Sequence, residues 1–158
     1  MGVAGCGKTT VGERLAEATG FGFIDGDRLH PQANIDKMSA GIALTDDDRR
    51  PWLETVGDTL ARADGPMIIG CSALKRSYRD IIRARAGGPV TFVHLSGSRQ
   101  LIGERMTART GHFMPPALLD SQFATLEPPA ADEDAVTVDV AAPLDDTVTM
   151  LAARFLGE

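Results

Sequence analysis

The sequence has no long hydrophobic run and no excess of basic residues. No apolar stretch approaches the roughly twenty residues of a membrane-spanning helix, and no signal peptide precedes the glycine-rich start. The 22 acidic residues outnumber the 16 lysines and arginines, which gives a net charge of −6. This balance argues against a surface for nucleic acid. We therefore expect a cytoplasmic protein whose partners include neither a membrane nor a nucleic acid.

Cysteine is also scarce, since the chain contains only Cys6 and Cys71. In a reducing compartment two such residues are expected to remain free thiols. The length of 158 residues and the ordinary apolar and charged fractions suit one globular domain with its own core. We expect residues 1–158 to form that single domain.

A phosphate-binding motif lies at residues 2–9, which match the pattern G-x-x-x-x-G-K-[ST] at every fixed position. Glycines let backbone N–H groups point toward phosphates, the lysine places a charge on the β- and γ-oxygens, and the threonine hydroxyl can coordinate Mg²⁺. We expect ATP and Mg²⁺ as cofactors, Thr9 as a metal ligand and Lys8 as a catalytic residue. The residues expected to bind the nucleotide here are Gly2, Gly5, Cys6, Gly7, Lys8, Thr9 and Thr10.

A glycine-rich turn could match this pattern by chance. The helical pattern of Val11, Leu15 and Ala18 follows directly, however, and ends at Gly20, as expected for the helix that continues a phosphate loop. The β-strand that normally precedes such a loop is absent, because only Met1 stands before Gly2. We expect the chain to be less stable than one with an added apolar strand, since parallel sheets bury this strand centrally.

Strand and helix patterns alternate along the rest of the chain. Short apolar runs predict strands over residues 21–25, 67–72, 90–95 and 135–140, and helical periodicity predicts helices over 77–86, 98–109 and 144–156. The alternation favours an α/β fold of three α/β/α layers with a mainly parallel sheet. Ligands of such a sheet gather at the carboxyl ends of its strands.

The segment from about residue 30 to 63 is too long for a simple crossover. A short helix is predicted over 32–39, and Thr45 with Asp48 three residues later predicts the start of a longer helix that contains Pro51. We expect this helical insertion to lie over the strand ends and to shape the substrate pocket.

Two carboxylates follow the strand over 21–25, in the sequence Asp25-Gly26-Asp27. Alternation along a strand would put both side chains on one face. The run MIIGCS lacks the terminal aspartate that many phosphate-loop enzymes place near the metal, so Asp25 is the best placed residue to hold Mg²⁺ through water. Asp27 could orient or deprotonate an attacking hydroxyl. The alternative is a solvated Asp-Gly-Asp turn.

Basic side chains follow the strand over 67–72. Lys75 and Arg76 come directly after it, with Arg79 one helical turn further on. Because this is the edge of the sheet where ligands bind, the cluster indicates an acidic substrate. The alternative is a solvated helix start, although cations at a helix N-terminus oppose the helix dipole.

Two arginines, Arg105 and Arg109, lie four positions apart on one predicted helix face. The glycine and prolines that follow predict a mobile lid at about 110–116. Closure of this lid would bring both arginines over the nucleotide, where they would stabilise charge on the transferred phosphoryl group, Arg109 as a catalytic residue. The alternative is an arginine-lined solvent face.

Taken together, these residues resemble the bacterial-type gluconokinases, small kinases of the shikimate kinase-like branch of phosphate-loop proteins. The match covers nearly the whole chain. It rests on the phosphate loop through Thr9, on Asp25-Gly26-Asp27 with Leu29-His30-Pro31, Asn34 and Lys37-Met38, on Leu44-Thr45-Asp46-Asp47-Asp48-Arg49 with Pro51-Trp52-Leu53, on Cys71-Ser72-Ala73-Leu74-Lys75 with Tyr78-Arg79-Asp80, and on Arg105, Arg109, Gly111-His112-Phe113, Gln122-Phe123 and Leu126-Glu127. The resemblance implies a P-loop kinase-like fold, phosphorylation of D-gluconate by ATP to 6-phospho-D-gluconate, and a homodimer.

The resemblance also implies roles for single residues. It implies that Asp27 lies beside the sugar hydroxyl and that Lys75 with Arg79 clamps the substrate carboxylate. Further sugar contacts are implied for His30, Arg49, His112 and Gln122. The chain departs from the family in the absent first strand and at Cys6, where a small hydroxyl residue is common.

Other functions fit these residues less well. A kinase of the same fold that acts on shikimate or another small hydroxy acid is the alternative. A GTPase-type switch is disfavoured because the chain contains no N-K-x-D and no D-x-x-G sequence. A non-catalytic nucleotide-binding module would be expected to lack one of Lys8, Thr9, Asp25 or Asp27, and all four are present.

Overall fold

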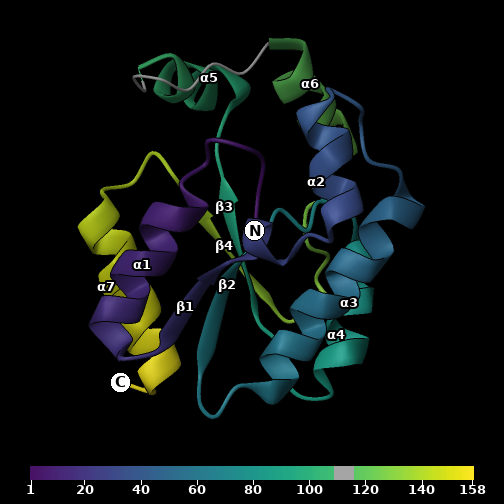
Figure 1. Cartoon of the computed structure of the whole chain (residues 1–158). Coiled ribbons are helices and arrows are strands. Elements are labelled where there is room, and N and C mark those ends of the chain that lie inside the picture. Colours follow the sequence, from purple (N-terminus) through teal and green to yellow (C-terminus); the bar gives the residue numbers. More distant parts are fainter. Residues whose placement is uncertain (109–115) are drawn as a thin grey trace.

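The structure is a computed structural model that describes residues 1–108 and 116–158 (Figure 1). The strands are β1 (Gly22–Asp25), β2 (Met67–Gly70), β3 (Phe92–Ser96) and β4 (Ala135–Asp139). The helices are α1 (Lys8–Thr19), η1 (Gly26–Leu29, a 3₁₀ helix), α2 (Gln32–Ser39), α3 (Asp46–Arg62), α4 (Arg76–Ala86), α5 (Arg99–Ala108), α6 (Pro116–Thr125) and α7 (Leu144–Leu156).

The described strands form two parallel pairs. β1 pairs with β2 from Gly22 opposite Met67, and β3 pairs with β4 from Phe92 opposite Ala135. Because both pairs are parallel and helices connect their strands, the predicted α/β class with a parallel sheet is confirmed.

The first two residues of the chain lie between these pairs. The Met1 ammonium donates to the Val93 carbonyl at 2.6 Å, and the Leu95 N–H donates to the Met1 carbonyl at 3.0 Å. This alternation is the start of a parallel ladder along β3. On the other side the Gly2 N–H donates to the Ser72 carbonyl at 3.1 Å, just beyond β2. Met1 and Gly2 thus join the two strand pairs.

A cavity of about 470 Å³ has residues of β2 on one side and of β3 on the other, with Met1 in its wall. Its lining includes the apolar side chains of Leu15, Ile68, Val93 and Phe155. An apolar strand before Met1 would run into this space, and the expected gain in stability from such a strand stays a prediction.

Helices cover both faces of the strands in three layers (Figure 1). α1 and α7 pack together on one face, where Leu15, Leu95 and Leu151 belong to one buried apolar cluster. α3 and α4 pack together on the other face, where Trp52 and Ile82 belong to a second cluster. α5 and α6 lie beyond the carboxyl ends of the strands (Figure 1). None of the helices in the described ranges combines the length and apolar character needed to cross a membrane.

Helix ends follow from local sequence. α1 begins after Gly7, whose φ of 101° favours glycine, and ends at Gly20, whose φ is 77°. α3 begins with the predicted capping box, in which the Thr45 hydroxyl accepts from the Asp48 N–H at 3.1 Å and the Asp48 carboxylate accepts from the Thr45 N–H at 2.9 Å.

Two features differ from the sequence-based expectations. α3 contributes Trp52, Leu53 and Val56 to the core, so the second half of the expected insertion is the crossover helix between β1 and β2. α6 was not predicted, because Pro115-Pro116 indicated a loop, whereas proline is favoured as the first residue of a helix. Apart from Pro116, the lid expected at 110–116 lies outside the described residues.

Candidate active site

The phosphate loop is built from left-handed glycines and a lysine that folds back over them. Gly5 and Gly7 have φ values of 77° and 101°, which side chains rarely adopt. The Lys8 ammonium donates to the carbonyls of Gly2 and Val3, each at 3.1 Å. The Cys6 side chain is buried in the core, so this residue contributes to the loop through its backbone. The loop therefore keeps its N–H groups and one cation near the start of α1.

α5 and α6 also contact this loop. A side chain at Gly5 would overlap Met106 of α5, which shows how closely that helix approaches. Arg105, the neighbour of Met106, is exposed. The Gln122 side chain of α6 accepts from the Ala4 N–H at 2.6 Å. We expected Gln122 to contact the substrate, but the structure places it against the phosphate loop.

Two other expected site residues cannot be placed. Arg109 and His112 lie outside the described residues.

Asp25-Gly26-Asp27 forms a tight turn at the carboxyl end of β1. The Asp25 carboxylate accepts from the Asp27 N–H at 3.0 Å and caps η1. Gly26 is buried, and a side chain there would overlap the Gly70 carbonyl of β2. The turn chemistry is thus real, and it leaves the Asp27 side chain exposed at the edge of the sheet.

The residues at this edge fit Mg²⁺. Within the described ranges, no cluster of three or more histidine, cysteine or acidic side chains could hold a metal alone. Magnesium at phosphate sites uses one or two protein oxygens together with phosphate oxygens and water, so a full protein cage is not required. Thr9 is exposed in the first turn of α1, and Asp25 is partly exposed at the end of β1.

An aromatic stack lies beyond the Asp-Gly-Asp turn. The His30 ring stacks on Trp52 with centroids 4.1 Å apart, and the Trp52 indole N–H donates to the Gly26 carbonyl at 2.9 Å. The Asn34 amide bridges the His30 ring nitrogen at 3.2 Å and the Asp48 carbonyl at 2.9 Å. Burial lowers the pKa of His30 from its ordinary value, which favours the neutral imidazole. These contacts of Trp52 and Asn34 with His30 were not predicted from the sequence.

A group of charged side chains surrounds the Tyr78 ring. The Lys75 ammonium lies 3.1 Å from the Asp46 carboxylate and 5.6 Å from the Tyr78 ring centroid. The Arg49 guanidinium lies 5.7 Å from the same centroid and donates to the Tyr78 hydroxyl at 3.4 Å and to the Leu44 carbonyl at 2.8 Å. The Tyr78 hydroxyl donates to Asp46. The structure therefore brings the expected Lys75 and Arg49 together as a partly exposed cationic pair.

Hydrogen bonds also set the charge states within this group. Those from Tyr78 and then Lys75 lower the pKa of Asp46, and the bond to Asp46 raises the pKa of Lys75. Lys75 therefore remains a cation well above neutral pH, as binding of a substrate carboxylate requires.

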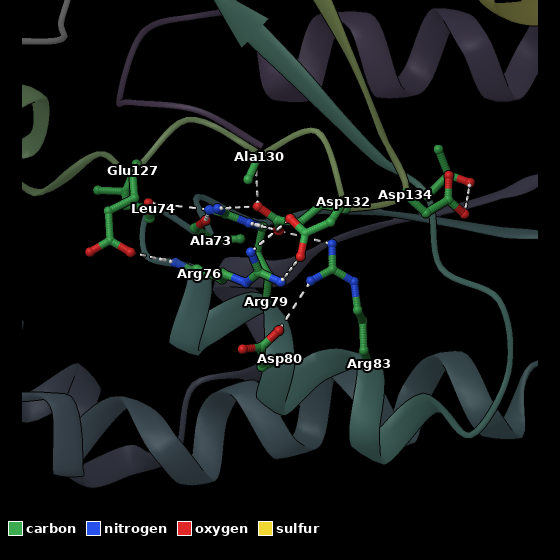
Figure 2. A network of polar contacts seen from close by, with 12 residues as sticks. Ala73, Leu74, Arg76, Arg79, Asp80, Arg83, Glu127, Ala130, Asp132 and Asp134 are labelled. Carbon is green, nitrogen blue, oxygen red and sulfur yellow. Dashed lines mark hydrogen bonds and ion pairs between the residues drawn. The ribbon is translucent and has the colours of Figure 1, made fainter.

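Arg79 does not join that pair, contrary to our expectation. Its side chain is fully buried, and its guanidinium is committed to Glu133 and to the carbonyls of Ala73 and Leu74 (Figure 2). A buried guanidinium with these partners cannot also contact a substrate bound at Lys75. Arg79 lies behind the turn that carries Lys75.

Comparisons with known proteins agree with this geometry. A family model described as an AAA domain matches residues 1–129. The thermosensitive gluconokinase of Escherichia coli K12 is 52% identical over 145 residues, covering 89% of this chain and 76% of that protein. The gluconokinase of Gluconobacter oxydans 621H is 45% identical over 161 residues, covering 100% of this chain and 90% of that protein.

Solved structures give the same result. A gluconokinase from Sinorhizobium meliloti 1021 matches with a TM-score of 0.86 and 52% identity, covering 99% of this chain and 93% of that one. A shikimate kinase from Aquifex aeolicus shares the fold at 17% identity with a TM-score of 0.59, covering 99% of this chain and 94% of that one. With this fold, this phosphate loop and these relatives, the chain belongs to the gluconokinase family of P-loop kinases.

Proposed function

We propose that the protein transfers the γ-phosphoryl group of ATP to D-gluconate, giving ADP and 6-phospho-D-gluconate. The observation that carries this proposal is the hydrogen bond from the Gly2 N–H to the Ser72 carbonyl. It joins the phosphate loop to the segment that ends at Lys75, so a site for phosphates and a cation for an acidic acceptor share one edge of the sheet. The family relationship supports gluconate as that acceptor.

The proposed reaction divides among residues of the two sides. Lys8 and the loop N–H groups hold the β- and γ-phosphates. Thr9 and Asp25 would hold Mg²⁺, which in phosphoryl transfer neutralises charge on the β- and γ-oxygens. The substrate hydroxyl attacks the γ-phosphorus, its proton passes to Asp27, and the bond to the ADP oxygen breaks. Arg105, in the last turn of α5, would add positive charge beside the loop.

The substrate carboxylate would bind the cationic pair of Lys75 and Arg49. Lys75 pairs with Asp46 at 3.1 Å, and an incoming carboxylate would compete for the same ammonium. The His30 and Trp52 stack would form the wall beside the hydroxyl groups, with His30 as their polar contact.

A related small hydroxy acid such as shikimate is the second candidate. It is less favoured, because the likeness to shikimate kinase at 17% identity shows the fold alone. A coupled assay of ADP release with gluconate, shikimate, glucose and no acceptor separates the candidates. We expect release that depends on gluconate. Equal release without an acceptor would overturn the kinase assignment, and faster release with shikimate would select the second candidate.

We also propose a cytoplasmic homodimer, as the resemblance to the gluconokinases implies. Light scattering after size exclusion tests the assembly, because one chain has a mass of 16.8 kDa. A mass equal to one chain at working concentrations would contradict the dimer. Cell fractionation tests the compartment.

A further inference from the structure

A buried ion pair stands behind the proposed substrate cation. The side chains of Arg79 and Glu133 are 0% and 1% exposed. The Arg79 guanidinium donates two hydrogen bonds to the Glu133 carboxylate, from Nε to Oε1 at 2.7 Å and from Nη2 to Oε2 at 3.0 Å. Glu133 is held in turn by the Arg83 guanidinium at 3.0 Å and the Ala130 N–H at 2.8 Å. Arg79 is therefore fixed in one orientation.

The free edge of this guanidinium is directed at the backbone of the turn before Lys75. Arg79 Nη1 donates to the Ala73 carbonyl at 2.9 Å and the Leu74 carbonyl at 3.3 Å. Ala73 has a φ of 44° and is the one residue other than glycine with a positive φ in the described part of the chain. Such a conformation is unfavourable for a residue with a side chain and persists only where its surroundings enforce it.

A second residue, Glu127, is also hydrogen-bonded to the backbone of this turn. The Glu127 N–H donates to the Leu74 carbonyl at 2.8 Å, and the Glu127 carboxylate accepts from the Arg76 N–H at 2.9 Å (Figure 2). The Leu74 carbonyl thus accepts from both Arg79 and Glu127. The backbone groups on both sides of Lys75, the Leu74 carbonyl and the Arg76 N–H, are therefore hydrogen-bonded.

This turn connects the two halves of the proposed site. It starts at Ser72, whose carbonyl holds the Gly2 N–H of the phosphate loop, and it ends at Lys75. The phosphate loop has further supports, at Val93 through Met1 and at Gln122 through Ala4. The backbone of Lys75 is held by this turn on one side and by α4 on the other, where the N–H groups of Tyr78 and Arg79 donate to the Lys75 carbonyl at 3.1 and 3.2 Å.

We infer that Arg79 is a positioning residue for the proposed phosphoryl transfer: through the carbonyls of Ala73 and Leu74, and anchored by Glu133, it sets where Lys75 holds the acidic substrate. This inference rests on the proposed function. Its chemistry is specific to arginine, because a lysine ammonium could pair with Glu133 but could not bind it in bidentate fashion and still reach both carbonyls.

Arg79→Lys tests the inference, with Arg85→Lys as the matched control. Arg85 lies on the same helix and makes a bidentate pair with Asp58, at 2.9 and 2.8 Å, away from the turn. We expect Arg79→Lys to lower kcat/KM for gluconate by about 10- to 100-fold, the order expected for a misplaced binding group. The KM for ATP should change little, and Arg85→Lys should behave like wild type.

A double-mutant cycle with Lys75→Ala distinguishes positioning from general loss of stability. If Arg79 acts through Lys75, Arg79→Lys should add almost no further loss in the Lys75→Ala background. If the conservative variant does not fold, Glu127→Ala replaces it, because Glu127 is exposed and its substitution removes the bond from the Arg76 N–H while keeping the backbone bond to the Leu74 carbonyl. It should show a smaller loss with the same lack of additivity.

Three results would overturn the inference. Losses that add in the double variant would show that Arg79 acts apart from Lys75. An equal rise in the KM for ATP and for gluconate would indicate a general structural role, and normal kinetics in Arg79→Lys would remove the role altogether. A wild-type protein without gluconate-dependent ADP release would overturn the proposed function first, and the inference with it.

Discussion

His30 lies nearly parallel to Trp52, with an angle of 18° between the rings and 4.1 Å between their centroids. The two residues come from different elements, His30 from the end of η1 and Trp52 from the crossover helix α3. Because the Trp52 indole also donates to the Gly26 carbonyl, this one side chain orients both the Asp-Gly-Asp turn and the imidazole.

Trp52→Phe tests that arrangement. Phenylalanine keeps an aromatic face for His30 but leaves the Gly26 carbonyl without its donor, and a buried unpaired carbonyl costs about 1–3 kcal/mol. We expect the free energy of unfolding, measured with urea, to fall by that amount, and the KM for gluconate to rise. An unchanged urea midpoint would mean that the indole bond contributes nothing.

Asp27→Asn should separate proton transfer from binding. Asparagine keeps the shape of the side chain but removes its charge and basicity, so turnover should fall by roughly 10²- to 10⁴-fold if Asp27 accepts the hydroxyl proton. The KM for ATP should hardly change. Steady-state kinetics with gluconate provides the measurement.

Asp25→Asn should respond differently, because Asp25 is proposed to hold the water shell of Mg²⁺. Its loss of turnover should be partly recovered at raised Mg²⁺ concentration, and that of Asp27→Asn should not. Recovery confined to Asp27→Asn would exchange the two roles. Near-normal turnover in both variants would leave Asp-Gly-Asp as a turn alone.

The buried pair of Arg79 and Glu133 should make the free energy of unfolding decrease as the pH falls into the acid range. The hydrogen bond from Arg79 lowers the pKa of Glu133 from 4.5 to about 2. A carboxyl group with a depressed pKa contributes stability above its unfolded pKa, and this contribution is lost as pH falls from about 4.5 to 2. Glu133→Gln should therefore be less stable at pH 6 but lose less on acidification. Urea unfolding at pH 6 and pH 3.5 measures the difference, and parallel losses in both proteins would contradict it.

Five apolar residues added before Met1 should raise the melting temperature. They would replace the ammonium with an amide and fill the cavity between β2 and β3, which could contribute several kcal/mol of apolar burial. Five glycine and serine residues are the matched control, since they remove the charge without adding apolar area. A melting temperature no higher with the apolar addition than with the control would show that the cavity does not accept a strand.

The parts of the molecule that could be predicted from sequence are those fixed by neighbouring residues. The phosphate loop, the capping box of Thr45 and Asp48, and the helix over Gln32–Ser39 all depend on groups a few positions apart. Strand ends were less accurate: the strand predicted to reach Ser72 stops at Gly70, because the left-handed Ala73 already bends the chain.

The misplaced site residues depend on distant partners. Sequence shows that Arg79 is a cation near a strand end, but not that Glu133, 54 positions later, will bind it. Gln122 likewise bonds to Ala4 across 118 positions. One available signal was the acidic run around Glu133, because its negative charge is complementary to the arginines of α4.

The distances along the chain also bear on how the protein is made. The phosphate loop is synthesised before Val93 and Gln122, which support it, and α1 is synthesised before Asp145, which pairs with Arg14 across 131 positions. Contacts of such large sequence separation form slowly, because the intervening chain must close before they yield any energy. The nucleotide loop should therefore gain its structure only near the end of synthesis, and a stalled chain that stops before α6 should not bind ATP.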